Sequence, residues 1–101
     1  MIKVLIKNEG NKFFSLEVKG HANSAPHGED LVCAGVSAIL TGGFNSLEKP
    51  EYFTIELKEG YAYLEKKNDI SQHDEVVIKT IITSLETVKE SYGKFIQIQR
   101  I

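Results

Sequence analysis

The sequence of 101 residues contains one cysteine, two prolines and no tryptophan. A single cysteine excludes an internal disulfide, and a lone thiol in a chain without an export signal is typical of the reducing cytoplasm. No run of about 18 apolar residues occurs, so the sequence predicts no membrane-spanning helix. The lysines are scattered and the net charge is −2, which argues against a nucleic-acid partner. We therefore expect a cytoplasmic protein without a membrane or nucleic-acid partner.

The composition fits one domain over residues 1–101. Hydrophobic residues make up 42% of the chain and charged residues 26%, which is ordinary for a folded globular protein. A chain of this length buries roughly 60–70% of its unfolded surface, which is enough for a stable core without disulfides. We expect a single hydrophobic core and no second domain.

Alternation of apolar and polar residues predicts two β-hairpins and a last strand. The first hairpin covers residues 2–7 and 14–19, on either side of a turn-forming stretch at 8–11. The last strand covers residues 95–101.

The second hairpin covers residues 52–58 and 61–66. With Glu59 and Gly60 as its turn, Leu57 lies opposite Ala62, and the residues two positions further from the turn also pair. That second pair is Ile55 and Leu64. These apolar residues share one sheet face with Phe53, and Tyr61 and Tyr63 project from the other face.

Apolar residues spaced three and four apart predict two helices. The first covers residues 29–47, with Glu29 and Asp30 in its first turn, and the pair Gly42-Gly43 weakens this helix and permits a close approach by a neighbouring element. Its buried stripe consists of Val32, Val36, Ile39, Leu40 and Phe44. The second helix begins at Ser71, with Asp74 three residues later, and ends at Gly93. Its buried stripe consists of Val77, Ile81, Leu85, Val88 and Tyr92.

The element order ββαββαβ predicts an α+β fold, in which two helices pack on one face of a mixed, mostly antiparallel five-stranded sheet. The open sheet face would still carry apolar side chains. These are Leu5, Phe13, Tyr61, Tyr63, Phe95 and Ile101. A patch of this kind favours self-association, so we expect a homodimer.

Cys33 is a candidate nucleophile because it falls in the first turns of the predicted first helix, directly after an irregular loop at 20–28. Unpaired N–H groups and the positive end of the helix dipole favour a thiolate there, and the same groups could hold an oxyanion. A lone cysteine can equally be a small packing residue.

A thiolate nucleophile needs a proton acceptor, and two histidines lie in the loop before Cys33. His21 directly follows the second strand and is favoured as the better anchored of the two. His27 lies closer to Cys33 in sequence and remains an alternative, and His73 is expected to be a surface residue near a helix cap.

Asp30 and Ser37 share the helix face of Cys33, since the three residues are spaced three and four apart. Asp30 could orient His21 or only cap the helix, and Ser37 could bond the imidazole or a backbone carbonyl. Metal-ligand spacing and phosphate-binding loops are absent, so we expect neither a metal nor a cofactor.

Two segments together resemble the signature of the ribosomal-processing cysteine protease (Prp) family. The first is Gly20-His21-Ala22, and the second runs from Glu29 through Asp-Leu-Val-Cys-Ala-Gly-Val-Ser to Ala38. Chain length, element order and motif position agree as well. The resemblance implies a bacterial cytosolic, homodimeric endopeptidase that removes the N-terminal extension of the precursor of ribosomal protein L27, after two phenylalanines, for ribosome assembly. It matches His21 to the general acid/base and Cys33 to the nucleophile, with Gly20, Asp30 and Ser37 as possible supporting residues.

Two other classes of protein remain open. A non-catalytic, ribosome-associated binding module would use Cys33 only for packing, and its thiol would alkylate slowly. A redox protein would use Cys33 alone, but the chain has no second cysteine to resolve a mixed disulfide.

Overall fold

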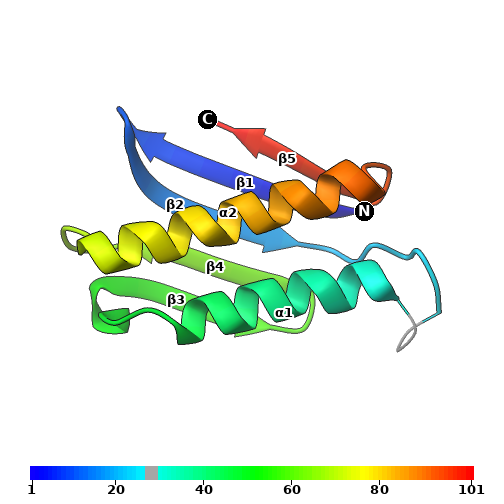
Figure 1. The fold of residues 1–101 in the computed structure, drawn as a ribbon, viewed down its shortest axis with the longest axis horizontal. Helices are drawn as coiled ribbons and strands as arrows, with labels where there is room; N and C mark the ends of the chain where they lie inside the picture. Colours follow the sequence, from blue (N-terminus) through cyan, green and yellow to red (C-terminus); the bar gives the residue numbers. More distant parts are fainter. Residues whose placement is uncertain (27–29) are drawn as a thin grey trace.

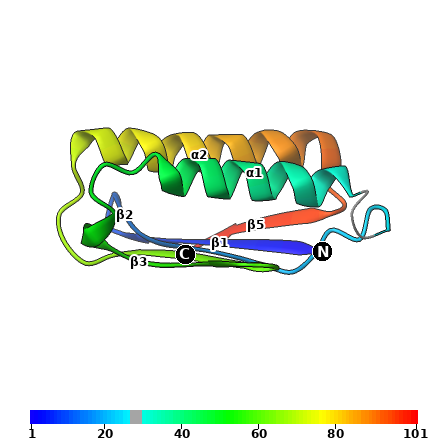
Figure 2. The ribbon, with the colours of Figure 1, turned by 90° about the horizontal axis from the view of Figure 1, so that it is seen from below.

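Two helices lie side by side on one face of a five-stranded sheet (Figure 1). The structure is a computed structural model and describes residues 1–26 and 30–101. Figure 2 shows the two layers edge-on, with both helices on the same side. The strands are β1 (Ile2–Glu9), β2 (Lys12–Lys19), β3 (Phe53–Lys58), β4 (Tyr61–Lys66) and β5 (Ile96–Arg100). The helices are α1 (Leu31–Asn45), α2 (Gln72–Tyr92) and the short 3-10 helix η1 (Pro50–Tyr52).

The strands are arranged in the order β3-β4-β2-β1-β5. β1 pairs with β5 in parallel, and all other neighbours are antiparallel. The predicted α+β class, the ββαββαβ order and the mixed five-stranded sheet are therefore confirmed. β3 is an edge strand, and two of its apolar residues stay partly open to solvent: Ile55 is 38% and Leu57 is 43% exposed.

The predicted register of the second hairpin is confirmed, because Leu57 pairs with Ala62 and Ile55 with Leu64. The first hairpin differs from simple alternation. Lys7 pairs with Ser15 but Asn8 pairs with Phe13, so Phe14 is the extra residue of a β-bulge.

The bulge turns Phe13 toward the helices, where it packs against the core. Phe95 precedes β5 and also packs against the core. The prediction that these two residues belong to an apolar patch on the open sheet face was therefore wrong.

The open sheet face is polar around Tyr61 and Tyr63. The phenol of Tyr61 donates a 2.9 Å hydrogen bond to Glu17 on the neighbouring strand β2. This bond to a carboxylate, with some burial, raises the pKa of Tyr61 to about 12. The phenol of Tyr63 donates to Glu65 in the same way. Both tyrosines therefore form hydrogen-bonded pairs with glutamates on this face.

α1 begins at Leu31, two residues later than predicted, and the predicted first-turn residue Glu29 lies outside the described residues. Asp30 is the N-cap, its side chain accepts the N–H of Cys33, and the first turn contains no acidic residue. Near the other end, a Cβ on Gly43 would collide with the side chain of Ile81. Gly43 therefore allows α2 to pack closely against α1, the close approach that the glycine pair predicted.

α2 begins at the predicted cap, where the Ser71 side chain accepts the N–H of Asp74. Its buried side includes Ile78 and Asp74, which the predicted stripe omitted. Tyr92 was predicted to be buried, but it is 42% exposed because it lies in the last turn of the helix. Gly93 is the C-cap, as predicted.

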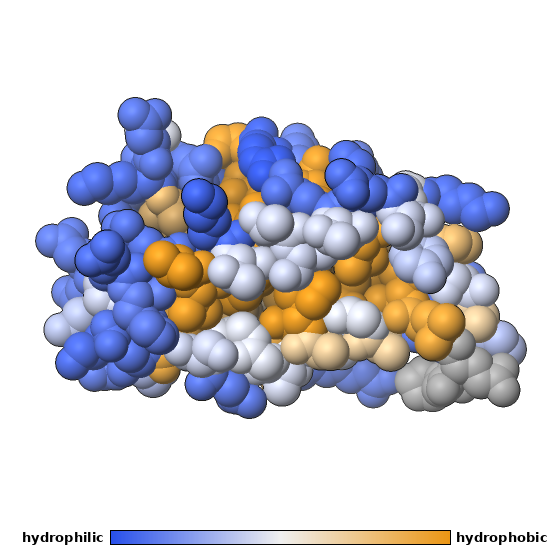
Figure 3. Space-filling view, in the orientation of Figure 1, coloured by the Kyte–Doolittle hydropathy of each residue, from blue (hydrophilic) through white to orange (hydrophobic). Residues whose placement is uncertain are grey.

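Apolar surface runs between the two helices on their outer side (Figure 3). A shallow groove of about 370 Å³ lies there, and its lining includes Ile39, Val76 and Ile81. The exposed apolar residues thus gather on the helix layer and the β3 edge more than on the open sheet face. Within residues 1–26 and 30–101, no helix is long and apolar enough to cross a membrane.

Candidate active site

A cleft of about 590 Å³ lies between the first half of α1 and the hairpin of β3 and β4. His21, just after β2, and Cys33, in α1, both line it. The turn residue Gly60 lines the cleft beside His21, and its carbonyl accepts the N–H of Gly20 at 3.0 Å. Figure 1 shows the start of α1 near the end of β2. The sheet and α1 therefore bring together two residues that are twelve positions apart.

Cys33 is half-buried in the first turn of α1. The backbone N–H of Ala22 donates to its Sγ atom over 3.2 Å. A donor aimed at sulfur stabilises negative charge on it. This contact could not be predicted from the sequence, because backbone donors are positioned by the path of the loop and not by residue type.

Asp30 organises the start of α1. One carboxylate oxygen accepts the N–H of Cys33 at 3.0 Å, and the carboxylate also accepts the N–H and the hydroxyl of Ser24. The Ser24 hydroxyl and the Cys33 N–H hold the pKa of the Asp30 carboxyl far below its usual range. Asp30 is thus a charged cap that ties the loop to the helix.

Two N–H groups at the start of α1 are satisfied by Asp30. The N–H of Cys33 bonds the Asp30 side chain, and the N–H of Ala34 bonds the Asp30 carbonyl at 3.0 Å. These two N–H groups are therefore not free to bind an oxyanion, contrary to what was expected of the first turn.

The imidazole of His21 is exposed to solvent and lies against Gly60. A Cβ atom built on Gly60 would be only 2.9 Å from Nε2 of His21. In the described part of the chain, no hydrogen bond joins His21 to Cys33 or to Asp30. Catalytic pairs often tighten only when substrate binds. The alternative histidine, His27, lies outside the described residues.

Two further predicted positions lie at the cleft. Ser37 is exposed one turn after Cys33 and lines the same cavity. Gly20 has φ +100, and a Cβ there would lie 2.5 Å from the carbonyl oxygen of Met1. Only glycine fits where the end of β2 passes the start of β1.

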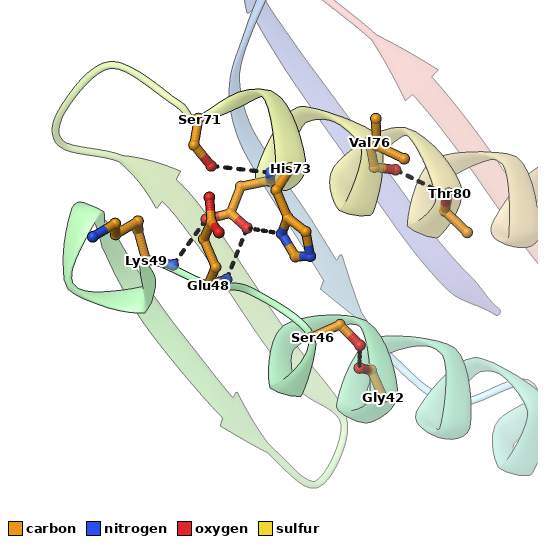
Figure 4. A network of polar contacts seen from close by, with 9 residues as sticks. Gly42, Ser46, Glu48, Lys49, Ser71, His73, Val76 and Thr80 are labelled. Atoms are coloured by element: carbon orange, nitrogen blue, oxygen red, sulfur yellow. Dashed lines mark hydrogen bonds and ion pairs between the residues drawn. The ribbon is translucent and has the colours of Figure 1, made fainter.

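A second polar cluster lies at the start of α2 (Figure 4). The buried Asp74 carboxylate accepts the N–H groups of Glu48 and Lys49 at 2.8 and 3.0 Å. Its Oδ1 atom also lies 2.9 Å from Nδ1 of His73. These bonds fasten the link that follows α1 to α2. His73 lies in the first turn of α2, near the helix cap, as predicted.

The charges in this cluster support one another. Burial alone would raise the pKa of Asp74, but the N–H of Glu48, the His73 ring and the N–H of Lys49 together lower it. The hydrogen bond to Asp74 in turn raises the pKa of His73.

The same cluster is the one group with metal-ligand spacing that the described residues contain, since ligand atoms of Glu48, His73 and Asp74 lie within 4.8 Å of one another. The Asp74 carboxylate is already engaged by three donors, and the α2 dipole opposes a cation at this end. The arrangement therefore suits a structural clasp better than a metal centre.

The cleft has the features of a cysteine hydrolase. A thiol at a helix start receives a backbone hydrogen bond, and an imidazole lines the same water-accessible cavity. The cavity has an apolar floor, which includes Val36, Leu40 and Ala62. Such a site can bind an extended chain and attack a carbonyl carbon.

Comparison with known proteins gives the same class. The family model described as cysteine protease Prp matches residues 1–97. The Bacillus subtilis ribosomal processing cysteine protease Prp is 37% identical over 101 residues, which cover 91% of this chain and 90% of that protein. The Staphylococcus aureus protein of the same name is 26% identical over 102 residues, which cover 96% and 94% of the two chains.

A solved structure agrees over its whole length. The Staphylococcus aureus ribosomal processing protease Prp, in complex with a covalently linked product peptide, has a TM-score of 0.89 and 26% identity, and each chain is fully covered. The present chain belongs to the Prp family of cysteine proteases. It is a hydrolase.

Proposed function

We propose that this chain is the endopeptidase that removes the N-terminal extension of the precursor of ribosomal protein L27, after a tandem phenylalanine, during ribosome assembly. The observation that carries the proposal is the cleft shared by Cys33 and His21, with the Ala22 N–H directed at the sulfur. The names of the relatives support ribosomal processing, and the covalent product peptide in the Staphylococcus aureus structure supports cleavage through an acyl-enzyme.

In this proposal, Cys33 is the nucleophile. Its thiolate sulfur attacks the carbonyl carbon of the second phenylalanine and forms a tetrahedral intermediate. The C–N bond then breaks, and protonated His21 gives its proton to the leaving amine. Water, deprotonated by His21, attacks the thioester carbon. The C–S bond breaks, which releases the carboxylic acid and regenerates Cys33.

The supporting residues act by position. The Ala22 N–H stabilises negative charge on the Cys33 sulfur before the attack. Asp30 holds the first turn of α1, and with it Cys33, at the rim of the cleft. Gly20 lets the end of β2 reach the cleft, and Ser37 offers a hydroxyl to the bound peptide.

The cleft provides a surface for aromatic side chains. Its floor of buried aliphatic residues continues to Leu57 on the exposed edge strand β3. Burial of a phenylalanine side chain against such a surface contributes about 1.5–3 kcal/mol. Two adjacent phenylalanines place rings on both sides of an extended chain, so one ring would lie on this floor.

The cellular setting follows from the same proposal. Residues 1–101 act as one protease domain in the cytoplasm, as a homodimer, without a cofactor, a membrane or a nucleic-acid partner. A net charge of −2 gives a small attraction to a basic ribosomal protein. Light scattering of the purified protein tests the dimer.

The test of the proposed function is cleavage of a synthetic peptide that spans the end of the L27 extension. We expect mass spectrometry to find one cut after the second phenylalanine. Cys33→Ala should abolish the cut and leave the circular dichroism spectrum unchanged, because the substitution is small and lies near a helix end.

A peptide with both phenylalanines replaced by serine serves as the substrate control and should stay intact. If the L27 peptide stays intact but Cys33 is alkylated rapidly, L27 is not the substrate, and the protein is a protease that acts on another substrate. An intact peptide with an unreactive thiol would favour the alternative, a non-catalytic binding module. Loss of the fold in Cys33→Ala would favour a packing role for this residue.

A further inference from the structure

We propose that Gly60, in the turn between β3 and β4, positions the His21 imidazole in the cleft by leaving the space that the ring occupies. This contact between Gly60 and the ring is called the seat below. The proposal rests on the proposed function, because it takes His21 as the general acid/base. It adds a positioning residue from a part of the chain that lies about 40 residues from His21.

The contact between the two residues is close. A Cβ atom on Gly60 would lie 2.9 Å from Nε2, 3.2 Å from Cε1 and 3.7 Å from Cδ2 of His21. The ring therefore lies over the one face of the turn that carries no side chain. Any larger residue at this position would have to share space with the imidazole, and the ring would move.

The backbone ties the same two segments together. The N–H of Gly20 donates to the carbonyl of Gly60 at 3.0 Å, so the residue directly before His21 is fastened to the turn. Gly60 and His21 also line the cleft that contains Cys33. The seat therefore fixes the imidazole on the wall that faces the thiol.

Position 60 requires glycine for two reasons, the positive φ of the turn and the contact with the His21 ring. A second glycine in the chain separates these two reasons. Gly60 has φ +74 and Gly10, in the turn between β1 and β2, has φ +62. Both positions disfavour a side chain for conformational reasons. A Cβ on Gly10, however, would meet nothing within 4 Å. Gly10 is thus a matched control for the turn, without the seat.

The first experiment compares Gly60→Ala with Gly10→Ala. We expect similar decreases in Tm, because both place alanine at positive φ. We expect kcat for the L27 peptide to fall at least about 10-fold in Gly60→Ala, since a displacement near 1 Å can cost about 100-fold. KM should stay within about twofold, and Gly10→Ala should keep the wild-type rate. Equal rates in the two variants would overturn the proposal.

The second experiment does not depend on activity. In NMR spectra of the full chain, the ring signals of His21 should shift in Gly60→Ala and stay in place in Gly10→Ala, with those of His73 unchanged in both. Unmoved His21 signals in Gly60→Ala would overturn the seat even if cleavage falls. If the wild-type protein leaves the peptide intact, the proposed function fails, and the NMR comparison still decides whether the seat exists.

A second pair of variants covers the case in which alanine prevents folding. Asparagine tolerates positive φ better than alanine does, and it still carries a Cβ. Gly60→Asn should therefore shift the His21 signals with little loss of Tm. Gly10→Asn should leave both the His21 signals and the Tm unchanged. Coincident His21 signals in these two variants would count against the seat.

Discussion

The two long helices begin at opposite ends of the molecule, and each start contains a carboxylate that accepts backbone N–H groups (Figure 1). At α2, Asp74 is fully buried and engaged by two backbone donors and His73. At α1, Asp30 is half-buried and borders a cleft of about 590 Å³ that also contains a thiol. A carboxylate with backbone donors thus lies at both helix starts, but Asp30 caps its own helix, whereas Asp74 binds the link that follows α1.

The difference lies in what remains open. The Asp74 cluster closes on itself, and its histidine bonds the carboxylate. At the start of α1, by contrast, His21 makes no hydrogen bond to Asp30 or Cys33 in the residues that the structure describes, and both His21 and Cys33 line the cavity. A satisfied, buried network stabilises the fold, whereas a thiol and an imidazole at a cavity are available for chemistry.

Exchange of each histidine for alanine gives the largest expected contrast. His21→Ala should lower kcat/KM for the L27 peptide by about 10²- to 10⁴-fold, because the leaving amine loses its proton donor. His73→Ala should leave kcat/KM within about twofold. Steady-state kinetics on both variants measure this. A full loss in His27→Ala, with His21→Ala unaffected, would reassign the general acid/base.

The two carboxylates should separate stability from activity. Asp74→Ala removes the charged acceptor of the Glu48 and Lys49 N–H groups. A hydrogen bond to a charged group contributes about 1.5–3 kcal/mol, so we expect the free energy of unfolding to fall by about 3 kcal/mol. Urea denaturation measures this. At urea concentrations well below the unfolding midpoint, the rate of peptide cleavage should equal that of the wild-type protein.

Asp30→Ala is the matched variant. Loss of a helix cap should cost about 1 kcal/mol, and the rate of cleavage should fall because the first turn of α1 carries Cys33. Equal unfolding energies for the two variants, or a slower cut in Asp74→Ala, would show that the two helix starts do not divide the roles in this way.

The smallest expected effect is on the pH dependence of stability. The pKa values of Asp30 and Asp74 are lowered in the folded state, so their contributions are present above about pH 4 and are lost as the pH falls through the lower folded values. The pKa of His73 is raised, so its contribution is full below about pH 6.5 and is lost as the pH rises through the folded value.

Thermal unfolding between pH 2 and pH 9 measures both slopes. We expect His73→Gln to flatten the fall in Tm on the alkaline side, and to flatten the acidic side to a smaller extent because the His73 ring also lowers the pKa of Asp74. An unaltered alkaline slope in this variant would mean that His73 does not contribute through its charge.

Local patterns in the sequence predict most of the fold. Alternation and a two-residue turn are sufficient for the register of Leu57 with Ala62, because a short hairpin allows few other pairings. The position of Phe13 could not be predicted, since a bulge depends on how β1 and β2 pair along their whole length. The burial of Asp74 depends likewise on donors from a distant link.

The candidate site divides in the same way. The position of Cys33 near a helix start and the irregular loop that carries His21 can be read from the sequence, because helix periodicity and loops are local signals. The contact of His21 with Gly60 and the Ala22 N–H on the sulfur depend on how β2, α1 and the second hairpin meet. Gly60 is visible in the sequence only as a turn residue.

In the proposed function, Cys33 is the nucleophile that attacks the carbonyl carbon of the second phenylalanine. A peptide with the L27 extension sequence and a C-terminal chloromethyl ketone after the second phenylalanine tests it directly, because alkylation captures the attacking atom. We predict one adduct per chain, mapped by mass spectrometry to Cys33, formed much faster than with a scrambled peptide and absent in Cys33→Ala. An adduct at another residue, or equal rates for the two peptides, would contradict the claim.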